Sequence, residues 1–141
     1  MNLTSPAFKH LGNIPSEHTC DGENISPELN IENPPKETKT FALIMEDPDV
    51  PKHIRPDGIW DHWIIWNIPL NTKKILEGTN PKGILGKNTR GNLAYSGPCP
   101  PDREHRYFFR LFALDTELNL VSGSTKQELL KMMQNHIIEQ T

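Results

Sequence analysis

This chain of 141 residues has few cysteines, no block of basic residues and no long apolar run. Lys and Arg total 15 against 18 Asp and Glu, so the electrostatic footprint of a nucleic-acid-binding protein is absent. No stretch approaches the ~20 apolar residues of a membrane span. The N-terminus lacks the cationic head and apolar core of a secretory signal. We therefore expect one cytoplasmic domain over residues 1–141, with no nucleic-acid partner and no membrane span.

The two cysteines, Cys20 and Cys99, are predicted to lie in different loops. In a cytosolic protein of this size we expect two free thiols, and a disulfide is the alternative. A metal site built from these cysteines with His62 and His105 is conceivable in three dimensions. The local spacing motifs of zinc sites are absent, however, so we predict no metal and no cofactor.

The chain does contain many turn signals and short apolar runs. Its 13 prolines are spread over loops, which favours a β-rich domain with shaped connections. Residues 40–45 and 60–68 read as buried strands. In the second strand, alternation places Trp60, His62, Ile64, Trp66 and Ile68 on one face. Residues 71–95 are rich in glycine and predict a long surface excursion.

A helix is predicted near the C-terminus. Thr125 is a suitable N-cap, and Glu128 completes a capping box. Apolar residues then recur at helical spacing and predict a packing face that comprises Leu129, Leu130, Met133, Ile137 and Ile138. The predicted fold class is therefore mainly β, with a C-terminal helix.

The most informative segment is a proline-rich loop, residues 97–101, that leads into a strand beginning at His105. Proline fixes φ and removes a backbone donor, so this loop should hold one shape. Alternation along the strand directs His105 and Tyr107 to one side and Arg106 to the other. A stiff loop beside polar side chains at the mouth of a strand is typical of a small-ligand site.

Four polar side chains converge if the three predicted strands are neighbours: Asp47, His62, His105 and Tyr107. Two imidazoles and a phenol suit an anion such as phosphate, and an aspartate can fix a histidine tautomer or bind an amine of the ligand. The alternative for His62 alone is a core histidine that donates to a backbone carbonyl. The coincidence of the four groups favours a binding site.

Cys99 also suggests a nucleophile with His105 as its base. The prolines around Cys99 supply no backbone N–H groups for an oxyanion hole, and no helix begins after it to lower the thiol pKa. We therefore predict no catalytic residue and no enzyme. A Cys/His-dependent hydrolase is kept as the alternative.

At these residues the chain resembles the phosphatidylethanolamine-binding protein family, in its bacterial and archaeal Raf-kinase-inhibitor-like branch. The matching segments span nearly the whole chain: Ser5-Pro6-Ala7-Phe8, Thr19-Cys20-Asp21-Gly22, Ser26-Pro27, Phe41-Ala42-Leu43, Asp47-Pro48-Asp49, Trp60-Asp61-His62-Trp63, Trp66-Asn67-Ile68-Pro69 and residues 97–115. The Asp-Pro-Asp and Gly-Pro-Cys-Pro-Pro elements, followed by His-Arg-Tyr, are the most specific.

The resemblance implies a two-sheet β-sandwich with a small anion pocket at one end and cis prolines in its loops. By position, it implies ligand-binding roles for Asp47, Trp60, His62, Gly97, Cys99, Pro101, His105 and Tyr107. It also implies a phosphate-containing ligand of the phosphoethanolamine type. Three further properties stay open: regulation of a partner protein, inhibition of a protease or kinase through surface loops, and a homodimer. Relatives usually have glycine where Arg103 stands and glycine in place of Ala94, and many continue beyond Thr141.

Overall fold

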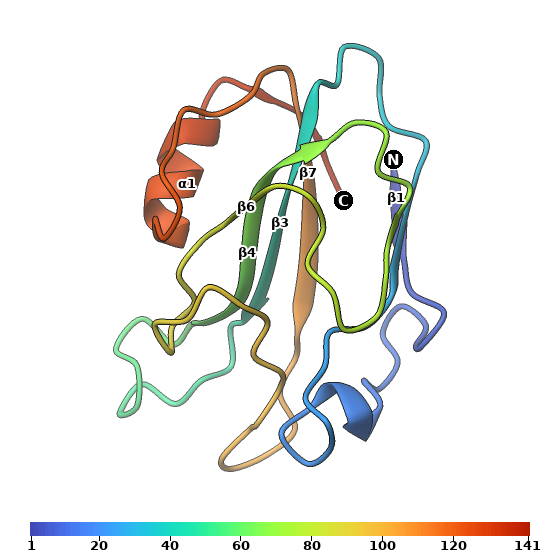
Figure 1. The fold of residues 1–141 in the computed structure, drawn as a ribbon. Helices are drawn as coiled ribbons and strands as arrows, with labels where there is room; N and C mark the ends of the chain where they lie inside the picture. Colours follow the sequence, from blue (N-terminus) through green and yellow to red (C-terminus); the bar gives the residue numbers. More distant parts are fainter.

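The computed structural model describes residues 1–141 and contains two antiparallel sheets and one C-terminal α-helix (Figure 1). The smaller sheet has the order β1-β2-β5, and the larger has the order β6-β4-β3-β7-β8. The elements in chain order are β1 (Asn2–Thr4), the 3-10 helix η1 (Ser16–His18), β2 (Leu29–Glu32), β3 (Thr40–Asp47), β4 (Trp60–Pro69), β5 (Lys74–Ile75), β6 (Ile84–Leu85), β7 (Phe108–Leu114), α1 (Lys126–Met133) and β8 (Ile137–Gln140).

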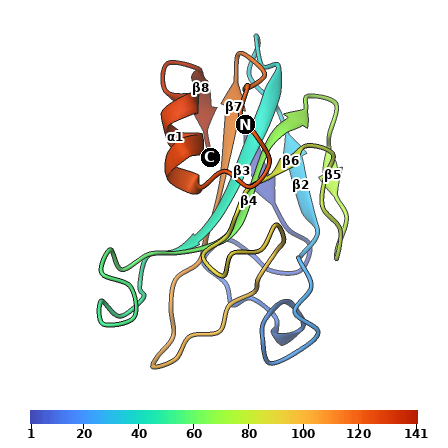
Figure 2. The same cartoon turned by 60° about the vertical axis from the view of Figure 1, so that its left-hand side comes forward.

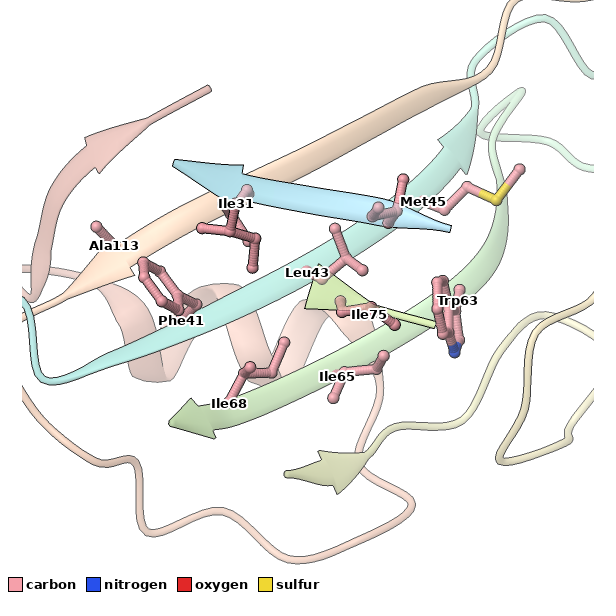
Figure 3. Packing of buried hydrophobic residues seen from close by; sticks show 11 residues of the cluster. Ile31, Phe41, Leu43, Met45, Trp63, Ile65, Ile68, Ile75 and Ala113 are labelled. Atoms are coloured by element: carbon pink, nitrogen blue, oxygen red, sulfur yellow. The ribbon is translucent and has the colours of Figure 1, made fainter. Parts of the chain in front are cut away.

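The larger sheet is covered on both faces, which explains why its central strands are apolar throughout. One face packs against the smaller sheet, and Figure 3 shows this core around Phe41, Leu43, Met45, Trp63 and Ile65. The other face packs against α1 through a second cluster that includes Ile44, Trp66, Leu129 and Met133. The predicted strands at 40–45 and 60–68 and the mainly β class are confirmed.

The predicted alternation along β4 is wrong at two positions. The pairing with β3 shifts between Met45–Trp63 and Glu46–Asp61, so His62 is an extra residue in a bulge. A second shift surrounds Asn67, whose φ of 53° lies in the left-handed region. After this shift Ile68 joins Trp63 in the core between the sheets rather than lying with Trp66. Bulges of this kind leave no periodic signal in a sequence.

The C-terminal helix is confirmed at its start and is shorter than predicted. Thr125 and Glu128 form the capping box, and Leu129 and Met133 are fully buried. The helix ends at Met133, however, and Ile137 and Ile138 belong to β8, where both are partly exposed. The chain leaves the helix at Gln134, whose ψ is 130°, and Asn135 follows with a φ of 68° in the left-handed region. The helical spacing of Ile137 and Ile138 is therefore coincidental.

The long connections gather at one end of the two sheets (Figures 1 and 2). They include residues 48–59 after β3 and the segment from 86 to 107 before β7, which starts three residues later than predicted. The excursion at 71–95 contains β5 and β6, and Ile75 is buried, so it is not wholly a surface loop. None of the peptide bonds is cis, which corrects that expectation. No helix is long and apolar enough to cross a membrane.

Candidate functional site

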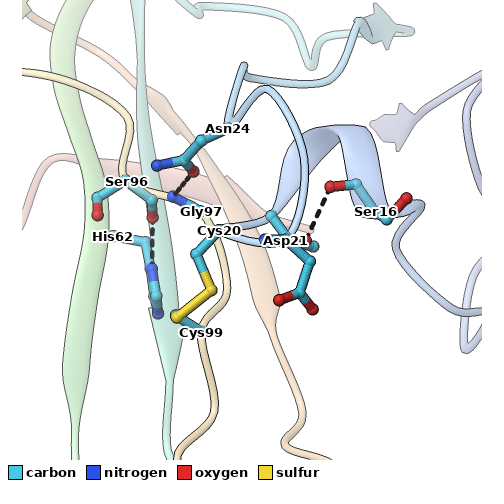
Figure 4. Close-up of a disulfide and its surroundings, with 9 residues drawn as sticks. Ser16, Cys20, Asp21, Asn24, His62, Ser96, Gly97 and Cys99 are labelled. Carbon is cyan, nitrogen blue, oxygen red and sulfur yellow. Dashed lines mark hydrogen bonds between the residues drawn. A yellow bond between two sulfur atoms is a disulfide. The ribbon is translucent and has the colours of Figure 1, made fainter.

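A disulfide between Cys20 and Cys99 corrects the expectation of two free thiols. It ties the loop after η1 to the proline-rich loop, across 79 residues of sequence (Figure 4). The prediction failed because spacing along the chain says nothing about which loops meet in space. With both sulfurs bonded, Cys99 is no nucleophile in this structure and neither cysteine offers a thiolate to a metal. Disulfides are rare in cytosolic proteins, so the bond does not favour the expected cytoplasmic location.

The proline-rich loop is held against its neighbours by backbone contacts. Cys20 N donates to Pro98 O at 3.0 Å, and Gly97 N donates to Asn24 Oδ1 at 2.8 Å. Gly97 is required here because an added Cβ would lie 2.2 Å from His18 O and 2.4 Å from Asn24 Oδ1. The loop therefore forms a fixed wall, as its prolines predict.

A cavity of about 190 Å³ lies between this wall and the ends of β3 and β4. It brings together seven of the eight predicted site residues: Asp47, Trp60, His62, Gly97, Cys99, Pro101 and His105. Its remaining lining residues are Val50, Ile54, Arg90 and Pro100. The convergence follows from the strand order β4-β3-β7, which makes the three predicted strands neighbours.

His105 is buried and both its ring nitrogens face carboxylates. Nδ1 lies 2.6 Å from Asp47 Oδ2, and Nε2 lies 2.7 Å from Asp102 Oδ1. Burial works against the charged imidazolium, but these hydrogen bonds outweigh it and raise the pKa of His105 above its usual value. Asp47 also accepts from Asp49 N at 2.8 Å, so its carboxylate fixes both the ring and the following turn.

His62 is buried on the cavity wall and differs from His105 in charge. Its Nδ1 donates to the carbonyl of Ser96 at 2.5 Å (Figure 4), while Nε2 is buried with no hydrogen-bond partner. Burial lowers the pKa of His62, and this effect is larger than the opposing effect of the Ser96 carbonyl and the nearby carboxylates. The ring is therefore neutral near pH 7, with a lone pair on Nε2.

Tyr107 is the predicted site residue that does not line the cavity. Its ring lies behind both histidines, with centroids 5.5 Å from His62 and 6.4 Å from His105. The hydroxyl is buried and has no hydrogen-bond partner. Burial raises the pKa of Tyr107, and the negative charge of Asp47 adds to the effect, so the phenol keeps its proton.

Arg106 points away from the cavity, as alternation predicts. Its Nε and Nη2 donate to Asp49 at 2.9 and 2.8 Å, and this pairing lowers the pKa of Asp49 to about 2. Arg103, the departure from the family pattern, is exposed and donates to the carbonyl of Glu104 at 3.2 Å. The ion pair between Arg106 and Asp49 holds the segment before β7 against the segment after β3.

Sequence reasoning missed Asp102 and Arg90. Asp102 is exposed, and only the fold of the 101–105 loop brings its carboxylate onto His105. Arg90 comes from the glycine-rich excursion and reaches the cavity rim. Neither residue has a local signal, since an isolated charge in a loop is most often solvated. Together the site offers an imidazolium, a neutral imidazole and a guanidinium around one small cavity, and the Tyr107 ring packs against both histidines.

Comparison with known proteins places this chain in one family. The family model for phosphatidylethanolamine-binding protein matches residues 4–141. A UPF0098 protein of Chlamydia pneumoniae is 48% identical over 140 residues, covering 99% of this chain and 93% of that protein. A UPF0098 protein of Methanothermobacter thermautotrophicus is 47% identical over 144 residues, covering 98% of this chain and 92% of that protein.

Two solved structures are similar over nearly the whole chain. The crystal structure of a putative phosphatidylethanolamine-binding protein homolog from Chlamydia trachomatis has a TM-score of 0.95 at 44% identity, covering 98% of this chain and 90% of that one. That of E. coli YbcL, described as a new member of the mammalian PEBP family, has a TM-score of 0.87 at 29% identity, covering 98% and 92%. The protein belongs to the phosphatidylethanolamine-binding protein family.

Proposed function

We propose that this protein is a non-enzymatic binding protein that takes a small phosphate-type anion into the cavity beside His62 and His105. The observation that carries the proposal is the buried Nε2 of His62, which stands on the cavity wall without a hydrogen-bond partner. Leaving such an atom unsatisfied costs about 1–3 kcal/mol. A ligand that supplies the partner recovers that free energy on binding.

Asp102 supports the nature of the ligand. Its carboxylate donates nothing and accepts from Nε2 of His105, which is how a phosphate oxygen would interact with the same atom. Asp102 is exposed, so its loop can release the histidine at little cost. We infer that a bound anion replaces Asp102 and that the guanidinium of Arg90 adds a positive charge at the rim.

The neutral state of His62 constrains the ligand further. Because Nδ1–H donates to the Ser96 carbonyl, Nε2 accepts a hydrogen bond until the ring is protonated. A phosphate monoester that carries a P–OH group can donate to it, or the ring can take up a proton as the anion enters. In both cases binding strengthens as the pH falls. The released Asp102 carboxylate is then free to meet an amine, which fits phosphoethanolamine.

Isothermal titration calorimetry with inorganic phosphate and with phosphoethanolamine tests the proposal. Asp102→Asn removes the competing carboxylate, so phosphate should bind about tenfold more tightly. Phosphoethanolamine should gain less, because its amine loses a partner. Glu104→Gln is the matched control, since it removes the same charge two residues further along an exposed segment. Phosphate affinity that is equal in Asp102→Asn and Glu104→Gln would refute the displacement of Asp102.

The hydrolase alternative is not proposed. It needs a thiolate at Cys99, which the disulfide removes, and backbone donors that the flanking prolines do not provide. Regulation of a partner protein, loop-mediated inhibition of a protease or kinase, and a homodimer stay predictions that follow from the family resemblance.

A further inference from the structure

A second group of metal-ligating side chains lies where η1 meets the segment after β5. Nε2 of His18 is 3.6 Å from Glu17 Oε1 and 4.0 Å from Glu77 Oε1. The three ligand atoms all lie within 4.8 Å of one another. We propose that His18, Glu17 and Glu77 bind a divalent transition-metal ion of the zinc type. This differs from the expectation of no metal and involves neither cysteine.

The state of His18 points to a cation. Its side chain is 1% exposed, and Nδ1 lies 2.9 Å from the carbonyl oxygen of Ile25. A carbonyl only accepts, so Nδ1 carries a proton, and the ring directs Nε2 at the two glutamates. Nε2 has no hydrogen-bond partner. Metal-ligating histidines are commonly oriented by such a bond from the other ring nitrogen to a backbone carbonyl.

The three ligands are held around one stretch of backbone. Ile25 O accepts from His18, while Ile25 N donates to Glu17 O at 3.3 Å. On the other side, Gly78 N donates to Ser26 O at 2.9 Å, which fixes the residue after Glu77. The histidine and both glutamate backbones are therefore anchored before a metal arrives. A preorganised ligand set loses less conformational entropy on binding.

The geometry and the donor types favour zinc over calcium or magnesium. Zinc–ligand bonds of ~2.1 Å place tetrahedral ligand atoms roughly 3.4 Å apart. The side chains of Glu17 and Glu77 are about half exposed, so each can close the remaining distance by a rotamer change. Imidazole with two carboxylates suits a transition metal, whereas calcium and magnesium prefer oxygen ligands only. Three protein ligands leave one position for water.

The competing explanation is an ion pair in which a protonated His18 simply contacts the two glutamates. Titration with zinc chloride by calorimetry separates the two. The wild type should bind one ion, and Glu77→Gln and Glu17→Gln should each weaken binding about tenfold or more. Both substitutions alter half-exposed side chains and preserve their size, so the fold is kept. Glu23→Gln, at an exposed glutamate a few residues away, is the matched control and should bind as the wild type does.

Paramagnetic NMR locates the ion. Cobalt(II) should shift or broaden the amide signals of residues 17–19 and 76–78, and Glu77→Gln should abolish this effect. Two other groups in the chain are chemical competitors: the exposed pair of His136 and Asp115, with Nδ1 and Oδ1 2.8 Å apart, and His105 between its two aspartates. Zinc binding that survives both glutamate substitutions, cobalt effects centred on His136, or no binding to the wild type would each overturn the proposal.

Discussion

Neighbouring residues at the ends of β3 and β4 face opposite sides of the same sheet, and their polar side chains differ in how completely they are paired. Glu46 and Asp61 face α1, whereas Asp47 and His62 face the cavity. All four side chains are buried or nearly so. Buried polarity alone therefore does not distinguish the two sides of the sheet.

On the helix side every charge has an opposite charge in contact. The ammonium of Lys126 lies 2.9 Å from Glu46 Oε2 and 2.6 Å from Asp61 Oδ1, and Arg110 lies 2.9 Å from Glu46 Oε1. Burial disfavours both charged forms, but these contacts outweigh it, lowering the pKa of Glu46 and raising that of Lys126. This is a closed ion cluster, and we assign it a structural role.

On the cavity side the polar groups are only partly satisfied. His62 Nε2 and the Tyr107 hydroxyl are buried without partners, and His105 is satisfied in part by a carboxylate from an exposed loop. Several buried polar groups without partners in one small region are typical of a binding site. Asp61 Oδ1 also has no hydrogen bond of good geometry, but it has the Lys126 ammonium in contact. The comparison therefore teaches that buried polar atoms with neither a hydrogen bond nor an opposite charge in contact, rather than burial, mark the ligand end of the sheet.

Loss of the disulfide should have the largest effect and should fall on the cavity side. A cross-link over 79 residues stabilises by about 4.5 kcal/mol in the chain-entropy model. Cys20→Ser/Cys99→Ser should lose about this much free energy of unfolding and should bind phosphate more weakly, because the cavity wall loosens. Denaturant unfolding and calorimetry measure the two effects. Two reactive thiols in the non-reduced wild type would contradict the cross-link itself.

Lys126→Met should break the helix side and spare the cavity. It leaves Asp61 buried without its cation, which costs about 3 kcal/mol. Lys74→Met is the control, because that ammonium pairs with Glu28 at 3.0 Å on an exposed surface and is worth less than about 1 kcal/mol. Denaturant unfolding should separate the two variants while phosphate affinity stays that of the wild type. A fall in affinity with Lys126→Met would show that the two sides are coupled.

Two tyrosines provide a finer test of the same contrast. The hydroxyl of Tyr95 donates to His18 O at 2.7 Å, so Tyr95→Phe should cost about 1 kcal/mol of stability and leave phosphate binding unchanged. Tyr107→Phe removes a hydroxyl that has no partner. It should leave the free energy of unfolding unchanged or slightly higher, as denaturant unfolding would measure. Equal stability losses would mean that the Tyr107 hydroxyl is satisfied inside the protein.

The smallest expected effect is a divergence of two histidine titrations. In the folded protein His62 should titrate below its ordinary pKa of 6.5 and His105 above it. The contribution of His62 to stability is thus lost as the pH falls from 6.5 through its folded pKa. That of His105 is complete below pH 6.5 and lost as the pH rises through its folded pKa. NMR of the ring Cε1–H signals measures both, and a shared midpoint would remove the distinction.

The sequence was sufficient for the strands that carry the site but not for the residues between them. The runs at 40–45 and 60–68 were recognisable because both faces of a covered sheet must be apolar. The bulge that turns His62 toward Asp47 has no periodic signature, and alternation alone placed His62 with Ile64. The disulfide and the contact between Asp102 and His105 depend on the conformations of the loops, which local sequence patterns do not determine. The ends of the predicted strands alone pointed to Asp47, His62 and His105, and the family resemblance added the loop residues that line the cavity.

The central claim is tested most directly by NMR of the histidine ring signals during a titration with inorganic phosphate near pH 6.5. We expect the Cε1–H signals of His62 and His105 to move together with one saturating affinity, and the pKa of His62 to rise as phosphate binds. The signal of His136, on an exposed loop pair with Asp115, should stay in place. If neither His62 nor His105 responds at saturating phosphate, the cavity is not an anion site.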